Sequence, residues 1–301
     1  MAISHSDQLE RRRLRRLSAR HHGQVEDFFR QDLAPNLFAL SWLSHHGLRQ
    51  KNTDTFGYWG IFDDGDLEAV CLAISQRLLM VDARRPRWAE AMGTYFKRRR
   101  CRFSHLVSRP RSIEPFWRAY QSQEPSWPME ARLIQEQRLY ELRPRDLAPL
   151  ADSSDDCLVR LATARDLDPV FFASIAMHRE ETLENPMDHN PQGFRHHVEN
   201  RIGNDRTYVW FDDRRHLLFK ADVSTRCRFG AQVSGVYTSP KARNRGLATR
   251  GLHRICEELF AQDVPRITLY VNRSNRPARR VYEKLGFLER CPYQTVFVAR
   301  K

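Results

Sequence analysis

A strand-like segment that runs through a short basic loop into a long helix is the feature that most constrains this chain. Residues 231–237 alternate apolar with polar or small side chains, and Pro240 then ends the strand because proline cannot donate to a sheet ladder. Arg243, Arg245 and Gly246 follow, and apolar residues at helical spacing begin at once. The N–H groups and positive dipole at a helix N-terminus attract anions. The loop therefore predicts a pyrophosphate cradle, although ordinary packing with surface charge would give the same pattern.

A second strand and helix follow directly. Residues 266–271 predict a strand, Asn275 is a good N-cap, and Gly286 supplies a helix stop. Asn275, Ala278 and Tyr282 share one face of the helix between them because their spacing is i, i+3 and i+7. On spacing alone, Tyr282 is equally a core tyrosine whose hydroxyl finds a backbone partner.

The remaining periodicity predicts an α/β chain with a mixed sheet. In the second half the order is β-α-α-β-β-β-α-β-α-β, with strands at 158–161, 207–211, 217–223, 231–237, 266–271 and 294–298 and helices at 164–179, 191–202, 244–260 and 276–285. In the first half we expect two helices within 24–47 broken at Pro35, a hairpin of strands 56–62 and 67–75, helix 86–97, strand 103–108, helix 113–120 and strand 132–142. Prolines and an acidic, serine-containing cluster predict a linker at 147–156, between domains at 24–146 and 157–301, with a basic arm at 1–23.

Charge and composition exclude several classes of protein. No apolar run approaches the roughly 18 residues of a membrane span, and the N-terminus lacks a signal peptide, so a soluble, cytoplasmic protein is expected. The cysteines form no C-x-x-C pair, and no metal site is expected. The net charge of +13 is uneven: residues 151–200 carry −6, residues 201–301 carry +12, and the first half carries +7. The sum invites a nucleic-acid partner, but this division makes one less attractive.

Residues 157–299 resemble the GNAT superfamily of N-acetyltransferases. Arg243, Gly246 and Ala248 match the superfamily's acyl-CoA pyrophosphate motif, in which arginine or glutamine is followed after two residues by glycine and then after one by glycine or alanine. Residues 269–287, with Asn275 and Tyr282, match the strand and helix that follow the motif. The resemblance implies an acyl-CoA N-acyltransferase (GNAT) fold in the C-terminal half. The N-terminal half resembles, by arrangement only, the additional domain of two-domain bacterial GNAT proteins.

The resemblance also implies the chemistry, which is direct transfer of an acetyl group from acetyl-CoA to a primary amine. A base must take a proton from the amine, a backbone N–H at Val236 would meet the oxyanion, and Tyr282 would protonate the departing thiolate. The residues implied to bind the cofactor are Val236, Tyr237, Thr238, Arg243, Asn244, Arg245, Gly246, Leu247, Ala248, Thr249, Asn272, Asn275, Ala278 and Tyr282.

The base is harder to assign because the strand before the loop carries no carboxylate, unlike that of many family members. Glu180, Glu181 and Glu184, after the first helix, and Asp222, on the adjacent strand, are the substitutes. Each glutamate is equally a solvated helix end. As a group they would attract a cationic amine.

The first half has no copy of the pyrophosphate motif, yet its strand 103–108 and the helix ending at Tyr120 echo the second half. We hypothesise a degenerate GNAT-like copy that has lost cofactor binding and shapes the acceptor site or docks a partner. The leading function is an N-acetyltransferase acting on a protein lysine, an N-terminus or a small amine, as a monomer or homodimer. The alternatives are a non-catalytic acyl-CoA-binding regulator and an RNA-associated acetyltransferase acting on aminoacyl-tRNA.

Overall fold

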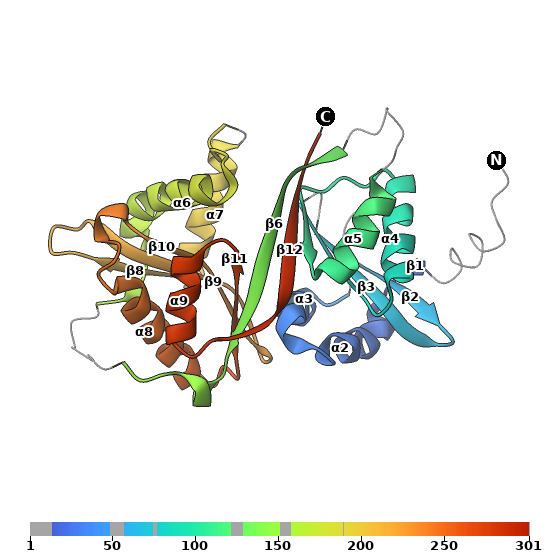
Figure 1. Cartoon of the computed structure of the whole chain (residues 1–301), viewed down its shortest axis with the longest axis horizontal. Helices are drawn as coiled ribbons and strands as arrows, with labels where there is room; N and C mark the ends of the chain where they lie inside the picture. The colour runs from blue at the N-terminus through green and yellow to red at the C-terminus, as the bar shows by residue number, and fades with distance from the viewer. Residues whose placement is uncertain are drawn as a thin grey trace. The chain divides into compact units, whose positions relative to one another are not determined.

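The computed structural model describes residues 14–48, 57–74, 77–121, 129–150, 158–188 and 190–300. These residues form two compact units, each with its own strands and helices (Figure 1). The first unit comprises residues up to Leu139 together with Arg290–Lys301, and the second comprises Tyr140–Glu289. The second unit therefore ends earlier than the predicted domain 157–301, because the last strand of the chain packs with the first unit. The predicted arm and linker fall largely on residues 1–13 and 151–157, outside the described residues.

The first unit is a mixed sheet with helices on it. Its strands follow the order β1-β2-β3-β4-β5-β12-β6, in which β4 and β5 are parallel. Buried side chains of α4 and α5, including Trp88, Phe96 and Phe116, form its core against the sheet. The elements are β1 (Leu14–Arg16), α2 (His22–Arg30), α3 (Leu33–His46), β2 (Gly57–Asp63), β3 (Asp66–Ile74), β4 (Leu78–Ala83), α4 (Pro86–Arg98), β5 (His105–Ser108), α5 (Pro110–Tyr120) and most of β6 (Met129–Leu142) and β12 (Leu288–Arg300).

The second unit repeats this plan. Its strand order is β6-β11-β10-β9-β8-β7, with β10 and β11 parallel. The elements are β7 (Arg160–Leu161), α6 (Leu167–Thr182), α7 (Pro191–Gly203), β8 (Thr207–Phe211), β9 (Leu217–Cys227), β10 (Gly230–Thr238), α8 (Leu247–Ala261), β11 (Ile267–Asn272), α9 (Arg276–Lys284) and the end of β6. Each half of the chain has the order β-α-α-β-β-β-α-β-α-β, which confirms the predicted mixed α/β fold and the GNAT-like arrangement of the first half.

The two faces of the second sheet differ in polarity. One face packs apolar residues such as Phe219, Val233 and Leu269 against α8 and α9. Beneath α6 and α7 the opposite face is apolar near β8, where Val209 lies, but turns polar toward β9, β10 and β11. The buried side chains on that polar part are Thr207, Lys220, Asp222, Gln232 and Thr268. A buried polar sheet face is costly unless it has partners or a function.

Several predicted boundaries are wrong for local reasons. Leu14–Arg16, assigned to the basic arm, is strand β1 because it pairs with β2, and β4 was missed. The break between α2 and α3 lies before Leu33, so Pro35 sits in the first turn of α3, where its missing N–H costs nothing. In the second half, α8 begins at Leu247 rather than at residue 244, because Asn244 and Gly246 are left-handed.

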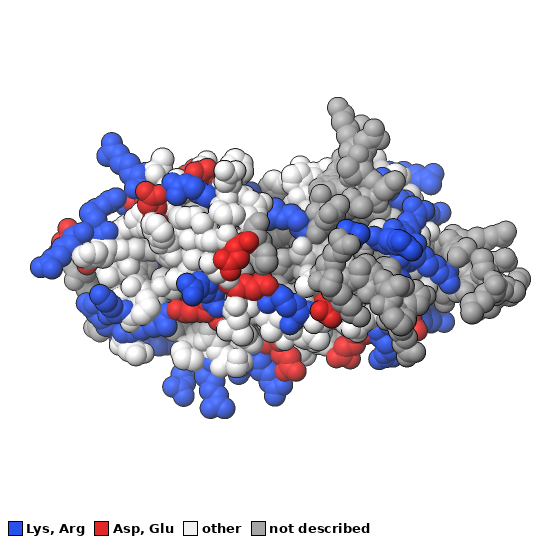
Figure 2. All heavy atoms as spheres, turned by 90° about the horizontal axis from the view of Figure 1, so that it is seen from above, with Lys and Arg blue, Asp and Glu red and all other residues white. Residues whose placement is uncertain are grey.

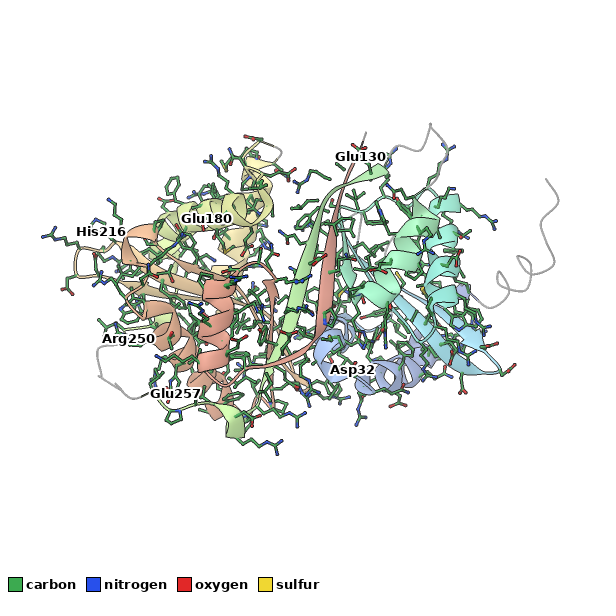
Figure 3. All side chains as sticks on the ribbon, in the orientation of Figure 1. Asp32, Glu130, Glu180, His216, Arg250 and Glu257 are labelled. Carbon is green, nitrogen blue, oxygen red and sulfur yellow. The ribbon has the colours of Figure 1, made fainter. Side chains whose placement is uncertain are left out.

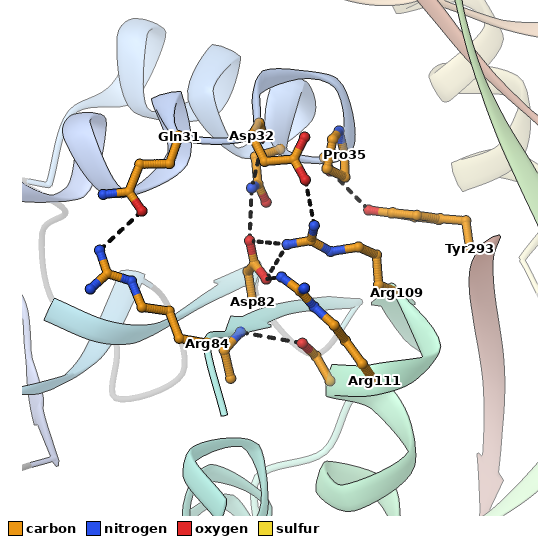
Figure 4. Close-up of polar contacts among 11 residues, drawn as sticks. Gln31, Asp32, Pro35, Asp82, Arg84, Arg109, Arg111 and Tyr293 are labelled. Atoms are coloured by element: carbon orange, nitrogen blue, oxygen red, sulfur yellow. Dashed lines mark hydrogen bonds and ion pairs between the residues drawn. The ribbon is translucent and has the colours of Figure 1, made fainter. Parts of the chain in front are cut away.

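A buried ion pair fills the parallel strand ends of the first unit (Figure 4). Beyond the paired residues of β4 and β5, the Arg109 guanidinium donates to both carboxylate oxygens of Asp82, at 2.6 and 2.8 Å, and to Asp32. Asn36 also donates to Asp82, at 2.8 Å. Only Arg84 and Arg85 separate β4 from α4, so this unit has no room for a phosphate loop.

None of the helices in the described ranges is both long and apolar enough to span a bilayer.

We expect Arg109→Leu to destabilise the first unit by about 3–5 kcal/mol, because it leaves the buried Asp82 carboxylate without its main partner. Replacing Asp82 with leucine as well should recover part of that loss. Urea unfolding of the two variants measures the difference, and equal stability of the single and double variants would contradict it.

Candidate active site of the second unit

The β10 strand has neighbours on both sides only at its start. Ala231 and Gln232 pair in parallel with β11, and within the described ranges no later residue of β10 pairs with β11. On its other side, β10 stays paired with β9 as far as Thr238. The last residues of β10 therefore present an unpaired backbone edge, which suits an extended ligand that adds hydrogen bonds like a strand.

A bulge lies at the same end of β10. Ser234 and Tyr237 pair with β9, and Gly235 and Val236 between them lie in the bulge. Gly235 has φ +57°, and a Cβ there would lie 2.3 Å from an Asp222 carboxylate oxygen, so no other residue fits. Val236, the predicted oxyanion donor, is thus on backbone that has left the regular ladder.

The loop after β10 fits an anion. Gly246, at φ +73°, is the N-cap of α8, and no side chain caps the first N–H groups of this helix. Arg243, Asn244 and Arg245 are exposed, and a Cβ on Gly246 would meet nothing within 4 Å. The helix therefore presents its N–H groups and positive dipole to open space between guanidinium groups. Leu247 and Thr249 are buried, so they anchor the first turn from below.

Arg243 already has a carboxylate partner. Its Nη2 lies 2.8 and 2.9 Å from the two oxygens of Glu180, which projects from α6 (Figure 3). Its Nε donates to the carbonyl of Thr238 at 3.1 Å. The structure thus joins a predicted phosphate ligand to a predicted base, and Glu180 is poorly placed to accept a proton from an amine. Both glutamates 180 and 181 lie inside α6 rather than after it.

The α9 helix presents Tyr282 as expected. Asn275 is the N-cap, accepting from the N–H of Ala278 at 3.2 Å, and Asn272 lies at the end of β11 before it. Tyr282 is 5% exposed and its hydroxyl makes no hydrogen bond to a described residue. Burial, together with the charge of Glu181, raises the pKa of Tyr282, so the phenol stays protonated at neutral pH.

Glu181 differs from its neighbour. The residue is exposed, yet the protein near its carboxyl group desolvates that group and raises its pKa. Lys220 opposes this rise, while Glu180 and Asp222 add to it. The charge of Glu181 also contributes to the raised pKa of Tyr282, so the two side chains are near enough to interact electrostatically. Glu184 follows the helix end at Leu183 and is half-buried.

Asp222 is fully engaged. Burial disfavours its ionised form, but Lys220 and Arg201 outweigh burial, so the pKa of Asp222 is lowered. Lys220 Nζ and Arg201 Nη1 each lie 2.8 Å from Oδ2, and the Thr207 hydroxyl donates to Oδ1 at 2.8 Å. A carboxylate with three donors and a lowered pKa is a weak base. Sequence reasoning missed Lys220, although two charges at positions 220 and 222 of an apolar strand were a signal.

Buried polar atoms without partners mark the polar part of the sheet face. Gln232 Oε1, Ser234 Oγ and Thr268 Oγ1 have no hydrogen-bond partner among the described residues, and Gln232 and Thr268 pair where β10 and β11 begin to part. The exposed basic loop and the unpaired β10 edge fit the pyrophosphate and the amide-containing arm of an acyl-CoA. The residues present therefore fit that group.

A cavity of about 160 Å³ adjoins this cluster beneath α6 and α7. Asp222, Arg201, His178 and His197 line it together with apolar side chains such as Phe194. Because Asp222 and Arg201 are among its lining residues, the cavity reaches the charged cluster of Lys220, Asp222 and Arg201 from the α6 and α7 side.

The family model for the acetyltransferase (GNAT) family matches residues 113–287, more than half of the sequence. The chain belongs to this family. GNAT enzymes use acetyl-CoA as co-substrate. The match begins in α5, upstream of the predicted domain start, and a comparison with curated proteins found no match.

Several solved structures share the fold over almost the whole of this chain. An acetyltransferase of the GNAT family from Sphaerobacter thermophilus is 13% identical, with a TM-score of 0.57 and 95% of each chain covered. One from Colwellia psychrerythraea is 12% identical, with a TM-score of 0.55, covering 94% of this chain and 99% of the other. A tandem GNAT protein from the clavulanic acid biosynthesis pathway is 15% identical, with a TM-score of 0.55, covering 95% and 98%. At these identities the likeness concerns the fold, and it includes the first unit.

We expect the Glu181 carboxyl carbon to titrate above the ordinary glutamate value of about 4.3, and that of Asp222 below the ordinary value of about 3.9. Between the lower pKa of Glu181 in the unfolded chain and its higher pKa in the folded protein, the folded state binds more protons than the unfolded state. The free energy of unfolding therefore falls as the pH rises through that window. Glu181→Gln should therefore gain stability relative to the parent at pH 8 but not at pH 3.5. Carbon-13 NMR and urea unfolding measure both effects, and a Glu181 midpoint at or below 4.3 would contradict them.

Proposed function

We propose that the second unit is an acetyl-CoA-dependent N-acetyltransferase whose acceptor is a primary amine. One observation supports the proposal: β10 parts from β11 at the end where the basic loop begins. Arg243 of that loop binds Glu180, the neighbour of Glu181 on α6, so the open strand edge, the basic loop and the acidic end of α6 lie together. The acceptor is a protein lysine, a protein N-terminus or a small amine, and the group of Glu180, Glu181 and Glu184 around the C-terminal end of α6 favours a cationic one.

Each group has one role in direct transfer. Acetyl-CoA, when bound, supplies the activated thioester. The 243–249 loop holds the pyrophosphate, the β10 edge from Val236 to Thr238 holds the arm, and Asn275 and Ala278 border it from α9. Glu181 takes a proton from the amine, whose nitrogen forms the new bond to the acetyl carbon. As the carbon–sulfur bond breaks, Tyr282 gives its proton to the thiolate.

Glu181→Gln should lower kcat by about 10²–10⁴, the usual contribution of a general base, and should abolish the acid limb of the rate profile. In the parent the rate falls at low pH as Glu181 becomes protonated, and the midpoint of this fall lies above the pKa of an ordinary glutamate. Thiol release from acetyl-CoA across pH 5–9 measures it.

Glu180→Gln is the matched control, one residue away on the same helix. It should leave the acid limb in place and tighten acetyl-CoA binding by up to about fivefold, since an exposed ion pair of up to about 1 kcal/mol no longer competes for Arg243. An acid limb lost in Glu180→Gln and kept in Glu181→Gln would reverse the assignment.

Tyr282→Phe should lower kcat by about 10²-fold or more with acetyl-CoA affinity within twofold, because it removes only the proton donor to the thiolate. Single-turnover kinetics with calorimetric affinities separate the two effects. Unchanged kcat would favour the second reading, an acyl-CoA-binding regulator that does not consume its ligand.

An RNA-associated acetyltransferase is a second candidate, favoured by one feature of the first unit. A cavity of about 530 Å³ is lined by Arg15, Arg16, Arg98 and Arg99 with Trp59 and Tyr95, and no acidic side chain of the described residues lines it. On the face drawn in Figure 2, however, basic side chains are spread out with acidic ones among them. Binding of a single-stranded RNA that weakens steeply between 50 and 200 mM salt would support it, and no binding at low salt would remove it.

A further inference from the structure

Lys220 is one of the fully buried charged groups of the second unit. Its side chain is 0% exposed, in the middle of β9, and its ammonium group has two acceptors. One is Oδ2 of Asp222 at 2.8 Å, and the other is the main-chain carbonyl of Gly235 at 3.1 Å. A lysine buried for stability alone would be a poor choice, because an apolar residue of similar volume avoids the desolvation cost.

The second acceptor matters because of where it lies. Gly235 is in the β10 bulge, so its carbonyl has left the regular ladder between β9 and β10. The described chain has no cis peptide, so the carbonyl of Gly235 and the N–H of Val236 belong to one planar trans unit and point in opposite directions. Holding the carbonyl toward Lys220 therefore turns the Val236 N–H away from it.

Two features restrict the peptide between Gly235 and Val236: the backbone conformation of Gly235 and the hydrogen bond from Lys220. Gly235 has φ +57° and leaves no space for a Cβ beside Asp222 and the Lys220 ammonium. Asp222 in turn accepts hydrogen bonds from Arg201 and Thr207, so the Lys220 ammonium group binds a carboxylate that is itself held in place.

We propose that Lys220 is a positioning residue that fixes the Gly235–Val236 peptide so that the Val236 N–H meets the thioester oxygen. The proposal rests on the proposed acetyltransferase function and deepens it. Lys220 does not touch the reacting atoms. It acts through one peptide plane, and its charge is balanced by Asp222.

Lys220→Met tests this, because methionine keeps the volume and removes the donors, while Asp222 keeps Arg201 and Thr207. The matched control is Ser224→Ala, which removes another bond from a β9 side chain to a β10 carbonyl, that of Gln232 at 3.0 Å, away from the bulge. We expect Lys220→Met to lower kcat by about 10²–10³, the usual effect of losing one oxyanion donor. Affinity for CoA, which lacks the acyl oxygen, should stay within twofold, and Ser224→Ala should keep its kcat within twofold.

Infrared difference spectra of acetyl-CoA labelled with carbon-13 at the thioester carbonyl give the readout that a merely structural role would not move. The carbonyl band should shift to lower frequency on binding the parent and Ser224→Ala, and should not shift on binding Lys220→Met. Lys220→Arg, which restores a donor, should recover at least tenfold of the lost kcat. Unchanged kcat, a retained band shift, or loss of CoA affinity together with activity in Lys220→Met would overturn the proposal.

If Lys220→Met does not fold, the parent protein still decides the matter. The Val236 amide resonance should move when acetyl-CoA replaces CoA, and an unmoved resonance would overturn the proposal. Failure of the acetyltransferase function itself looks different, since the parent would then release no thiol from acetyl-CoA in the presence of amines, whether or not it binds acetyl-CoA.

Discussion

The parting of β10 from β11 is the constraint on which the rest of the second unit depends. Two parallel strands that stay paired leave no backbone for a ligand, whereas β10 keeps β11 only as far as Gln232. The bulge at Gly235 lets β10 change direction while β9 still supports it. The loop that follows then brings the N-terminus of α8 to the open end. The open strand edge and the proposed phosphate site both follow from that one departure.

In the first unit, the gap between the equivalent parallel strands β4 and β5 is filled by side chains. Its β4 and β5 also stop pairing, but Arg109 enters the gap and binds Asp82 and Asp32. In the second unit the corresponding region keeps Lys220 and Asp222, together with buried polar atoms that have no partner in the described structure. Buried charges and unsatisfied polar groups cost stability. We infer that the second unit keeps this cost because the region serves the proposed catalysis, whereas in the first unit a buried ion pair occupies the strand ends.

The sequence predicted the elements whose signals are local. Periodicity placed α7, α9 and most strands, and Asn275 and Gly286 placed the ends of α9. The family motif identified the loop at Gly246. The sequence could not reveal contacts between distant residues, such as Arg243 with Glu180 and Lys220 with the Gly235 carbonyl. Nor could it reveal that β12 belongs with the first unit. Glu180 and Glu181 are neighbouring glutamates that the sequence does not distinguish. In the structure Glu180 forms an ion pair with Arg243, and desolvation raises the pKa of Glu181, which is why the proposal assigns them different roles.

The most direct test of the central claim is the stoichiometry of acetyl-CoA binding to the full chain, measured by isothermal titration calorimetry. The second unit has an open β10 edge followed by a basic loop, whereas in the first unit the Arg109–Asp82 ion pair fills the corresponding strand ends. The account therefore predicts one acetyl-CoA per chain. That binding should weaken at least tenfold when Arg243 and Arg245 are both replaced by alanine. No binding at millimolar acetyl-CoA, or two equivalent sites per chain, would contradict it.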